Sequence, residues 1–395
     1  MNANCYIAVI LLAAVDAVLI APNECRSAEL KADDASSLRN AIAEARPGDT
    51  IVLAIGAYAM GERTLETTSD GTAAKPIAMR AAGDNGYAVL KLDGDIGFRV
   101  KNQFWKFEGI HFKGNPERSQ ATVFMDGPQG CESVSFVDCK ISDSAGYGIK
   151  TARNPGSAVD HVLIEFTEVF NTGGTAVDIV GGDHWIVRRN YVHAFGTGGG
   201  TNYGIFLKGG GAKGLIEGNL VDGEHQSGSI GISFGGGLTG KQFMPLVDDK
   251  SPAEHKHGIC RNNIVVNTSD VAYHSNNADS CAFYNNLAFG CAGFQRQKSQ
   301  GTDPLLINNA IGALRGALDS SARNMEAGQA EWFQNPSEYD FRLTETGKSK
   351  LMQSAESIDD NPTDLFGNAR DKDSPISGPI LPGEKEASVW QDRRS

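Results

Sequence analysis

The sequence predicts an all-β fold, a right-handed parallel β-helix (a solenoid) with an N-terminal capping helix. The main observation is a short sequence motif that recurs along the chain. Each copy has an apolar residue three positions before its key residue. The period of the motif indicates stacked structural repeats, and its apolar alternation is typical of strands. Strands this brief bury a face only when successive coils stack on each other. The key positions, 23 to 44 residues apart, are Ile110, Cys139, Thr167, Asn190, Asn219, Asn263, Asn286 and Asn309.

The chain begins with an apolar stretch, residues 6–21, which is too short for a comfortable transmembrane span. It is typical of the core of a signal peptide, which we place at residues 1–28. The mature protein is therefore expected to be secreted or periplasmic, with no stable membrane insertion. An N-terminal anchor is the alternative.

The next element is an amphipathic helix at residues 33–45, in which Leu38, Ala41 and Ile42 share one face and Asp or Ser can cap the start. Such a helix would cover the open strand edge at the first coil. The β-helix with this cap is expected to span residues 29–325. Residues 326–395 are expected to form a last coil, near 331–343, and a C-terminal capping tail.

Composition fits one elongated domain, which we expect to be a monomer. The chain has 395 residues, of which 47 are Gly, as the repeated corners of a β-helix require. A net charge of −12 argues against nucleic acid as a partner. An acidic polysaccharide could bind only at a local basic cleft or through a cation. Cys260 is expected to be a buried thiol, and a disulfide with Cys281, about one coil away, is the alternative.

Inner Asn residues at the key positions are expected to form a hydrogen-bonded ladder with a structural role. A second strand of each coil carries the candidate functional residues. Its inward residues are expected to be Ile149, Val177, Ile205, Ile232 and Ala272, which leaves Lys150, Asp178, Phe206, Ser233 and Tyr273 outward.

Lys208 follows Phe206 by two positions and should lie diagonally beside Asp178 on the same outer face. Glycine triplets at 209–211 and 235–237 follow on consecutive coils and would let a polymer approach the backbone closely. Residues 235–257 form a long insertion, and insertions on repeat scaffolds usually sit on the binding face. The alternative is that these glycines only turn corners and that Lys208 is a solvated surface charge.

Several segments resemble a known group of enzymes. Residues 37–53, 56–58 and 75–77, which include the run Ala-Arg-Pro-Gly-Asp-Thr-Ile-Val-Leu, resemble the N-terminal region of chondroitinase B and the related alginate lyases. Residues 204–208, Gly-Ile-Phe-Leu-Lys, resemble the strand that carries the catalytic lysine of those enzymes and of family-nine pectate lyases. The resemblance covers most of residues 36–310. It implies that Lys208 is the base of a β-elimination on a uronate, and that either Ca²⁺ as a cofactor or an Arg or Lys side chain neutralises the substrate carboxylate.

The chain departs from that pattern where the resemblance would place acidic calcium ligands, because Thr201 and Tyr203 occupy those positions. Asp178 is left as the candidate metal ligand, although Ca²⁺ takes six to eight oxygens. Candidate neutralisers of the substrate carboxylate are Arg296, Lys298, Lys213 and Lys241. The residues expected to bind substrate are Lys150, Phe206, Lys213, Tyr273 and Arg296.

The motifs of other β-helix enzymes are absent from the sequence: it has neither the Gly-His-Gly of polygalacturonase-like hydrolases nor the Asp-Pro-His of mannuronan epimerases. An inverting hydrolase also needs two facing carboxylates. The expected function is therefore a secreted lyase that cleaves a uronic-acid-containing polysaccharide. A non-catalytic β-helix that binds carbohydrate or serves as a surface structure is the alternative.

Overall fold

The computed structural model describes residues 27–125, 130–152, 159–237, 239–240, 244, 253–297, 302–316, 321–322, 324–352 and 355–383. The predicted signal segment, residues 6–21, lies outside this part of the chain. The two described α-helices, α1 (Ala35–Glu44) and α2 (Glu345–Met352), have 10 and 8 residues. A bilayer-spanning helix needs about 20 apolar residues, so neither helix could cross a membrane.

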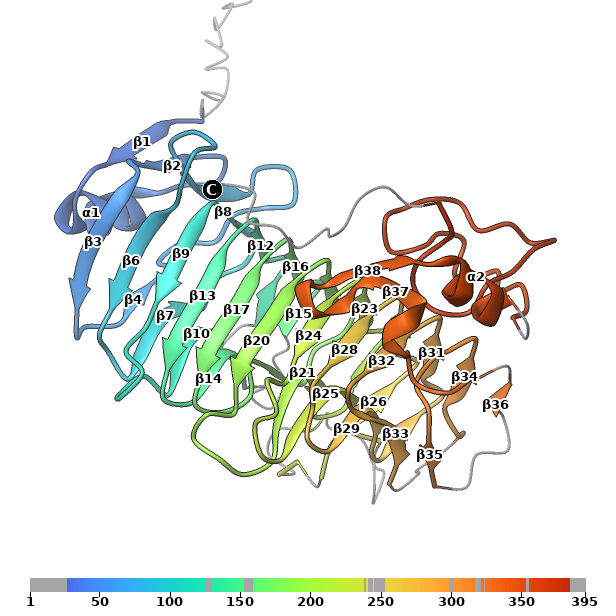
Figure 1. The fold of residues 1–395 in the computed structure, drawn as a ribbon. Coiled ribbons are helices and arrows are strands. Elements are labelled where there is room, and N and C mark those ends of the chain that lie inside the picture. The colour runs from blue at the N-terminus through green and yellow to red at the C-terminus, as the bar shows by residue number, and fades with distance from the viewer. Residues whose placement is uncertain are drawn as a thin grey trace, which may run out of the picture.

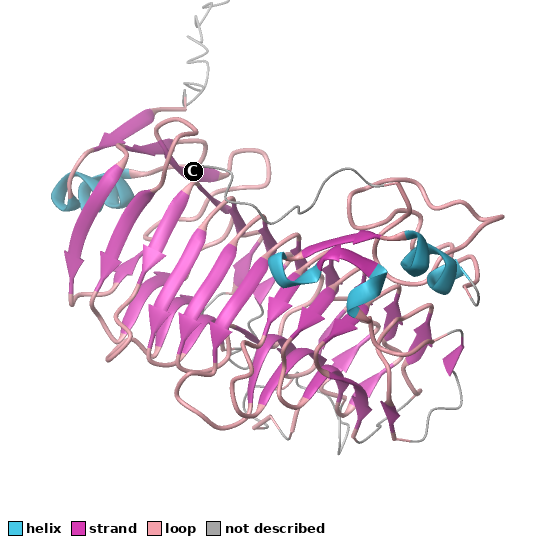
Figure 2. Cartoon of the chain, in the orientation of Figure 1, coloured by secondary structure: helices cyan, strands magenta, loops and turns pink. Residues whose placement is uncertain are grey.

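The chain winds into a right-handed parallel β-helix, as the sequence predicts, and its strands stack coil upon coil along one axis (Figures 1 and 2). Three long parallel sheets, named A, B and C here, form its walls. Sheet A contains β1 (Glu29–Ala32), β2 (Thr50–Leu53), β5 (Ile77–Ala81), β8 (Trp105–Glu108), β12 (Ser135–Val137), β16 (Leu163–Glu165), β19 (Ile186–Arg188), β23 (Leu215–Glu217), β27 (Ile259–Arg261), β31 (Ala282–Tyr284), β34 (Leu305–Ile307) and β36 (Ser321–Ala322).

Sheet B contains β3 (Gly56–Gly61), β6 (Ala88–Leu92), β9 (Ile110–Lys113), β13 (Lys140–Ser144), β17 (Glu168–Thr172), β20 (Tyr191–Phe195), β24 (Leu220–Asp222), β28 (Ile264–Val266) and β32 (Leu287–Phe289). Sheet C contains β4 (Leu65–Glu66), β7 (Ile96–Val100), β10 (Ala121–Met125), β14 (Tyr147–Thr151), β18 (Val177–Val180), β21 (Asn202–Lys208), β25 (Ser229–Phe234), β29 (Val271–Ser275), β33 (Ala292–Arg296) and β35 (Leu314–Arg315). The small sheets contain β11 (Cys131–Glu132) and β15 (Val159–Asp160), then β22 (Gly211–Ala212), β26 (His255–Lys256) and β30 (Ala278–Asp279), and finally β37 (Phe333–Asn335) and β38 (Asp340–Leu343).

The predicted apolar row of the repeat is confirmed in sheet A. Its residues occupy one register position on successive strands and are fully buried: Phe107, Phe136, Ile164, Val187, Ile216, Cys260, Phe283 and Leu306. Each coil therefore presents the same environment at this position, which is why one motif can recur. The described cysteines are free thiols, so Cys260 and Cys281 do not form the alternative disulfide.

The Asn ladder is also confirmed. The side-chain oxygen of Asn219 accepts hydrogen bonds from the backbone N–H and the side-chain amide of Asn190, each at 3.0 Å. Asn219 makes the same two donations to Asn263 on the following coil. The ladder continues through Asn286 and Asn309, and it ends at Asn324, one coil beyond the predicted row. These buried amides satisfy one another where sheet A turns into sheet B.

The predicted cap helix is α1. Asp34 is its N-cap and accepts a hydrogen bond from the Ser37 N–H at 2.7 Å, while the Ser37 hydroxyl accepts one from the Asp34 N–H. Leu38, Ala41 and Ile42 are buried against the first coil. The sequence interpretation missed β1, which precedes α1 and pairs with β2 as the outermost strand of sheet A.

The C-terminal segment differs from the expected last coil and cap. The strands β37 and β38 pair antiparallel as a hairpin, because the 3₁₀ turn η3 (Pro336–Glu338) and Tyr339, at φ 58°, reverse the chain between them. Together with η2 (Ala330–Trp332), α2 and residues 355–383, the hairpin lies along the outside of sheet B (Figure 1). Apolar residues of this segment form a second core with the outward residues of β24, β28 and β32.

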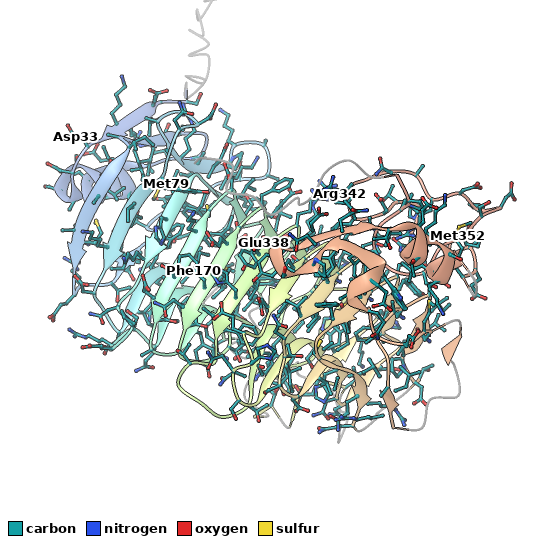
Figure 3. All side chains as sticks on the ribbon, viewed as in Figure 1. Asp33, Met79, Phe170, Glu338, Arg342 and Met352 are labelled. Carbon is teal, nitrogen blue, oxygen red and sulfur yellow. The ribbon has the colours of Figure 1, made fainter. Side chains whose placement is uncertain are left out.

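The segment covers only part of sheet B. Figure 3 labels Glu338 and Arg342 on the C-terminal segment, and Phe170 on β17, which the segment leaves open. A row of left-handed Asn residues explains where residues 355–383 attach. Asn262, Asn285 and Asn308 have φ between 51° and 58° and directly precede three residues of the inner ladder. Each repeated Asn-Asn pair therefore sends one amide inward and the other toward the C-terminal segment.

We expect Asn285→Gly to release residues 355–383 while the β-helix stays folded. Asn285 donates hydrogen bonds to the carbonyl oxygens of Ile376 and Gly378 and accepts one from Asn361. Glycine keeps the backbone conformation at φ 51° but removes all three bonds. Limited proteolysis with mass spectrometry should show faster cleavage within 355–383. Lys213→Gly, at an equally left-handed but exposed turn, is the control, and equal cleavage of both variants would contradict the expectation.

Candidate active site

An open cavity of about 420 Å³ lies on the outer face of sheet C. Its lining comes from three successive strands and from the long insertion between β25 and β26, and consists of Lys150, Val180, Thr201, Tyr203, Phe206, Lys208, Gly237, Thr239 and Gly240. A volume of this order suits a ligand of a few sugar units. Of the described residues of the insertion, Gly237, Thr239 and Gly240 therefore line this cavity.

The register of sheet C brings the charged residues together. Lys150 pairs with Asp178 and Asp178 with Phe206 on the next strand, while Val180 pairs with Lys208. Because side chains alternate along a strand, these residues point outward while their neighbours enter the core. The predicted inward row is confirmed at Ile149, Val177, Ile205 and Ile232, which are fully buried.

Asp178 lies between the two lysines. The Lys150 ammonium donates a hydrogen bond to Asp178 Oδ2, and the Lys208 Nζ lies 3.6 Å from Oδ1. Asp178 is almost wholly buried, and its Oδ1 has no hydrogen-bond partner among the described residues. Burial lowers the pKa of Lys150 from its ordinary value, while the charge of Asp178 opposes that shift. With both lysines charged, the three side chains carry one net positive charge.

Each of the two ammonium groups lies over an aromatic ring. The Lys150 Nζ lies 4.6 Å from the ring centre of Tyr147, and the Lys208 Nζ lies 4.2 Å from that of Phe206, in the range of cation–π contacts. Tyr203 stacks on Phe206 with ring centres 3.8 Å apart. Burial raises the pKa of Tyr203 to about 12, so its phenol stays protonated. The sequence interpretation noted Tyr203 only as a missing calcium ligand.

The described residues of the insertion pack tightly against this cluster. A side chain at Gly236 would place its Cβ 2.5 Å from the Phe206 ring, so glycine is required there. The buried Glu254 side chain accepts hydrogen bonds from the backbone N–H groups of Gly209 and Thr239. These bonds hold one edge of the cavity against the end of β21.

The structure contradicts the prediction that Tyr273 faces the substrate. Tyr273 pairs with Ile232 and is fully buried, and its hydroxyl lies within hydrogen-bond distance of the carbonyl oxygens of Asn263, at 3.0 Å, and Leu287, at 2.8 Å. Ala272 therefore matches the glycine that precedes Ile232, and the predicted alignment was one residue out of register on this coil. The outward residue of β29 is His274.

His274 does not line the cavity. It is 2% exposed, and its Nδ1 lies 3.0 Å from the hydroxyl of Ser233 on the neighbouring strand. Burial lowers the pKa of His274 to about 4, so the imidazole is neutral near neutral pH. Ser233 and His274, the two outward residues that follow Phe206 along sheet C, are therefore both buried.

Two further predicted substrate contacts lie elsewhere. Lys213 sits in an exposed left-handed turn after β22, outside the cavity lining. Arg296 pairs with Asp303 and does not line the cavity either. Lys241 and Lys298 lie outside the described residues.

The residues around Asp178 do not fit a calcium ion. In the described part of the chain, no three His, Cys, Asp or Glu side chains gather in a way that could hold a metal. Both oxygens of Asp178 face lysine ammonium groups, which would repel a divalent cation. Thr201 and Tyr203 line the cavity at the positions where the resemblance would place acidic ligands.

On the N-terminal side, the outward column of sheet C continues with the same residue types. Lys150 pairs with Phe124, and Phe124 pairs with Arg99. The Arg99 guanidinium carbon lies 5.8 Å from the ring centre of Phe124. Three cation–aromatic pairs therefore follow one another along the β-helix axis, with Asp178 between the two lysines and Glu66 next to Arg99.

Comparison with known proteins supports the architecture. A family model described as "Right handed beta helix region" matches residues 121–311. Among solved structures, pectate lyase Pel9A is 14% identical, with 90% of this chain and 97% of that chain covered and a TM-score of 0.54. The GH136 lacto-N-biosidase from Eubacterium ramulus is 12% identical, with 76% and 67% covered and a TM-score of 0.51.

The alginate lyase from Paenibacillus sp. str. FPU-7 is 17% identical. The match covers 74% of this chain and 99% of that chain, with a TM-score of 0.45. No curated protein sequence matches the chain. The fold and the family model define a right-handed parallel β-helix protein, an architecture that pectate lyase Pel9A shares. Identities this low establish the fold alone, and a fold shared by a lyase and a biosidase does not select the chemistry.

Proposed function

We propose that the protein is a polysaccharide lyase that cleaves a uronic-acid-containing polysaccharide by β-elimination, with Lys208 as the base. One observation carries the proposal: the Lys208 amine lines an open cavity on the outer sheet, beside a second lysine and stacked aromatic rings. Such a cavity presents positive charge and flat apolar surface to an acidic sugar. The strand at residues 204–208 also resembles the strand of the catalytic lysine in known lyases. Export of the chain, expected from residues 6–21, belongs to the same proposal.

The reaction assigns each group a task. The neutral amine of Lys208 accepts the proton from C5 of the uronate, and the electron pair of that C–H bond forms a C4=C5 double bond. The C4–O4 bond breaks, O4 leaves with the bonding pair and takes a proton from water, and Lys208 returns its proton to water. Bound in the cavity, the polymer would meet the half-buried ring of Tyr203, which stacks on the buried Phe206, and Gly237 as a side without a side chain.

A carbohydrate-binding protein without catalysis is the second candidate. One observation favours it: Lys208 lies 3.6 Å from the Asp178 carboxylate, a contact that stabilises the protonated amine, whereas a base must be neutral. The two functions differ in one product, the unsaturated uronate, which only a lyase forms.

We expect the wild-type protein to release unsaturated uronate from at least one polymer among alginate, pectate and glycosaminoglycans. The new double bond conjugates with the carboxylate, so the product can be followed by ultraviolet absorbance and confirmed by mass spectrometry. The control is Lys106→Ala, which removes an exposed lysine on sheet A. Binding of these polymers without any unsaturated product would contradict the lyase proposal and favour the second candidate.

A further inference from the structure

We propose that Lys150 supplies the positive charge that neutralises the substrate carboxylate, so that the site works without a metal ion. The inference rests on the proposed lyase function and identifies the group that the sequence left unassigned. In the described part of the chain, Lys150 and Lys208 are the only cationic residues that line the cavity. If one acts as the base, the other remains to meet the carboxylate.

The chemistry requires such a charge close to the base. The C5 proton of a uronate becomes acidic enough only when the adjacent carboxylate is neutralised, since negative charge develops there as the proton leaves. The carboxyl carbon is bonded directly to C5, so the base and the cation must lie side by side. Lys150 and Lys208 meet this condition because they approach the two oxygens of one carboxylate, that of Asp178.

Lys150 has two contacts that favour its ammonium form, against the burial that lowers its pKa. It donates one hydrogen bond to Asp178 and lies over the ring face of Tyr147 at 4.6 Å, and both contacts favour the charged form. An ammonium group has three N–H donors, so donors remain for a substrate carboxylate in the cavity. Asp178 is then a positioning residue that fixes Lys150.

A metal ion fits this place poorly. Asp178 is the one carboxylate that the two lysines share, and its oxygens already face their ammonium groups. A divalent cation would have to displace both lysines and find further oxygen ligands, while no metal-binding group of acidic, His or Cys residues occurs among the described residues. The donor set therefore suits a lysine charge better than calcium.

The test compares variants on a polymer that the wild type cleaves. We expect Lys150→Ala to lower kcat/KM by on the order of a hundredfold, the loss typical of one electrostatic stabiliser. Lys150→Arg should keep activity within about tenfold of wild type, because guanidinium remains charged, whereas Lys208→Arg should stay inactive. A chelator should leave wild-type turnover unchanged, and added Ca²⁺ should not raise it.

The proposed role of Lys150 also requires that the carboxyl group of the substrate be charged. On a methyl-esterified polymer, whose carboxyl group is uncharged, the loss caused by Lys150→Ala should shrink toward that of the control Lys106→Ala. The inference is overturned if Lys150→Arg is as inactive as Lys150→Ala, or if a chelator abolishes turnover and Ca²⁺ restores it. In both cases the lyase proposal would stand.

Binding gives a readout independent of turnover. In a Lys208→Ala background, calorimetry with a uronate oligosaccharide should show weaker binding when Lys150→Ala is added, with or without a chelator. Binding that depends on Lys150, without cleavage by wild type, would support the charge role and contradict the lyase. If no uronate is bound or cleaved, both proposals fail.

Discussion

Lys208→Ala is expected to lower turnover of a uronate polymer by on the order of a thousandfold, within the range for loss of a general base. The loss should fall on kcat, because the variant removes the group that takes the C5 proton and leaves most of the cavity lining in place. Folding should be unaffected, since the side chain points out of sheet C and the strand keeps its backbone pairing with Val180.

Lys208→Arg should not restore activity, because guanidinium stays protonated and cannot act as a base. The basic form of lysine is the neutral amine, so wild-type kcat/KM should rise as the pH is raised. Steady-state kinetics, with circular dichroism to verify folding, would measure these effects. Wild-type rates in Lys208→Ala, on a polymer that wild type cleaves, would remove Lys208 from the mechanism.

The sequence was sufficient for most of the fold because a solenoid repeats its environments. A residue such as Asn219 has the same kind of neighbour on the coil above and on the coil below. One recurring sequence motif therefore identifies the equivalent position on every coil. The strict alternation of a strand then predicts the outward positions of Lys150, Asp178 and Lys208. Their contacts in sheet C agree with that prediction.

The misplaced residues lie where the repetition breaks down. Tyr273 was placed one residue out of register because the coil that precedes it contains the long insertion, and an aromatic residue is as suited to the core as to a surface. Tyr203 is part of the site because its ring stacks on that of Phe206, a contact that local sequence does not encode. The path of the C-terminal segment depends on side chains of distant coils, among them Asn262 and Asn285.

The Asn ladder should be the part of the fold most sensitive to a single substitution. Asn263 is fully buried, and its side-chain oxygen accepts from the backbone N–H and the amide of Asn219. Its own amide donates to the Ile216 carbonyl and to the Asn286 side chain. In Asn263→Ala, these partners lose their hydrogen bonds in a site that water does not reach.

Because each buried polar group left without a partner costs about 1–3 kcal/mol, Asn263→Ala should lower the free energy of unfolding by about 3–5 kcal/mol. Urea unfolding followed by tryptophan fluorescence would measure the loss, since Trp105 and Trp185 are buried in the core. The control is Asn40→Ala on the exposed side of α1, where we expect a change within about 0.5 kcal/mol. Equal unfolding midpoints for the two variants would show that the ladder contributes no more than a surface amide. A large loss confined to Asn263→Ala would mean that stacked amides, and not apolar burial alone, keep the coils together.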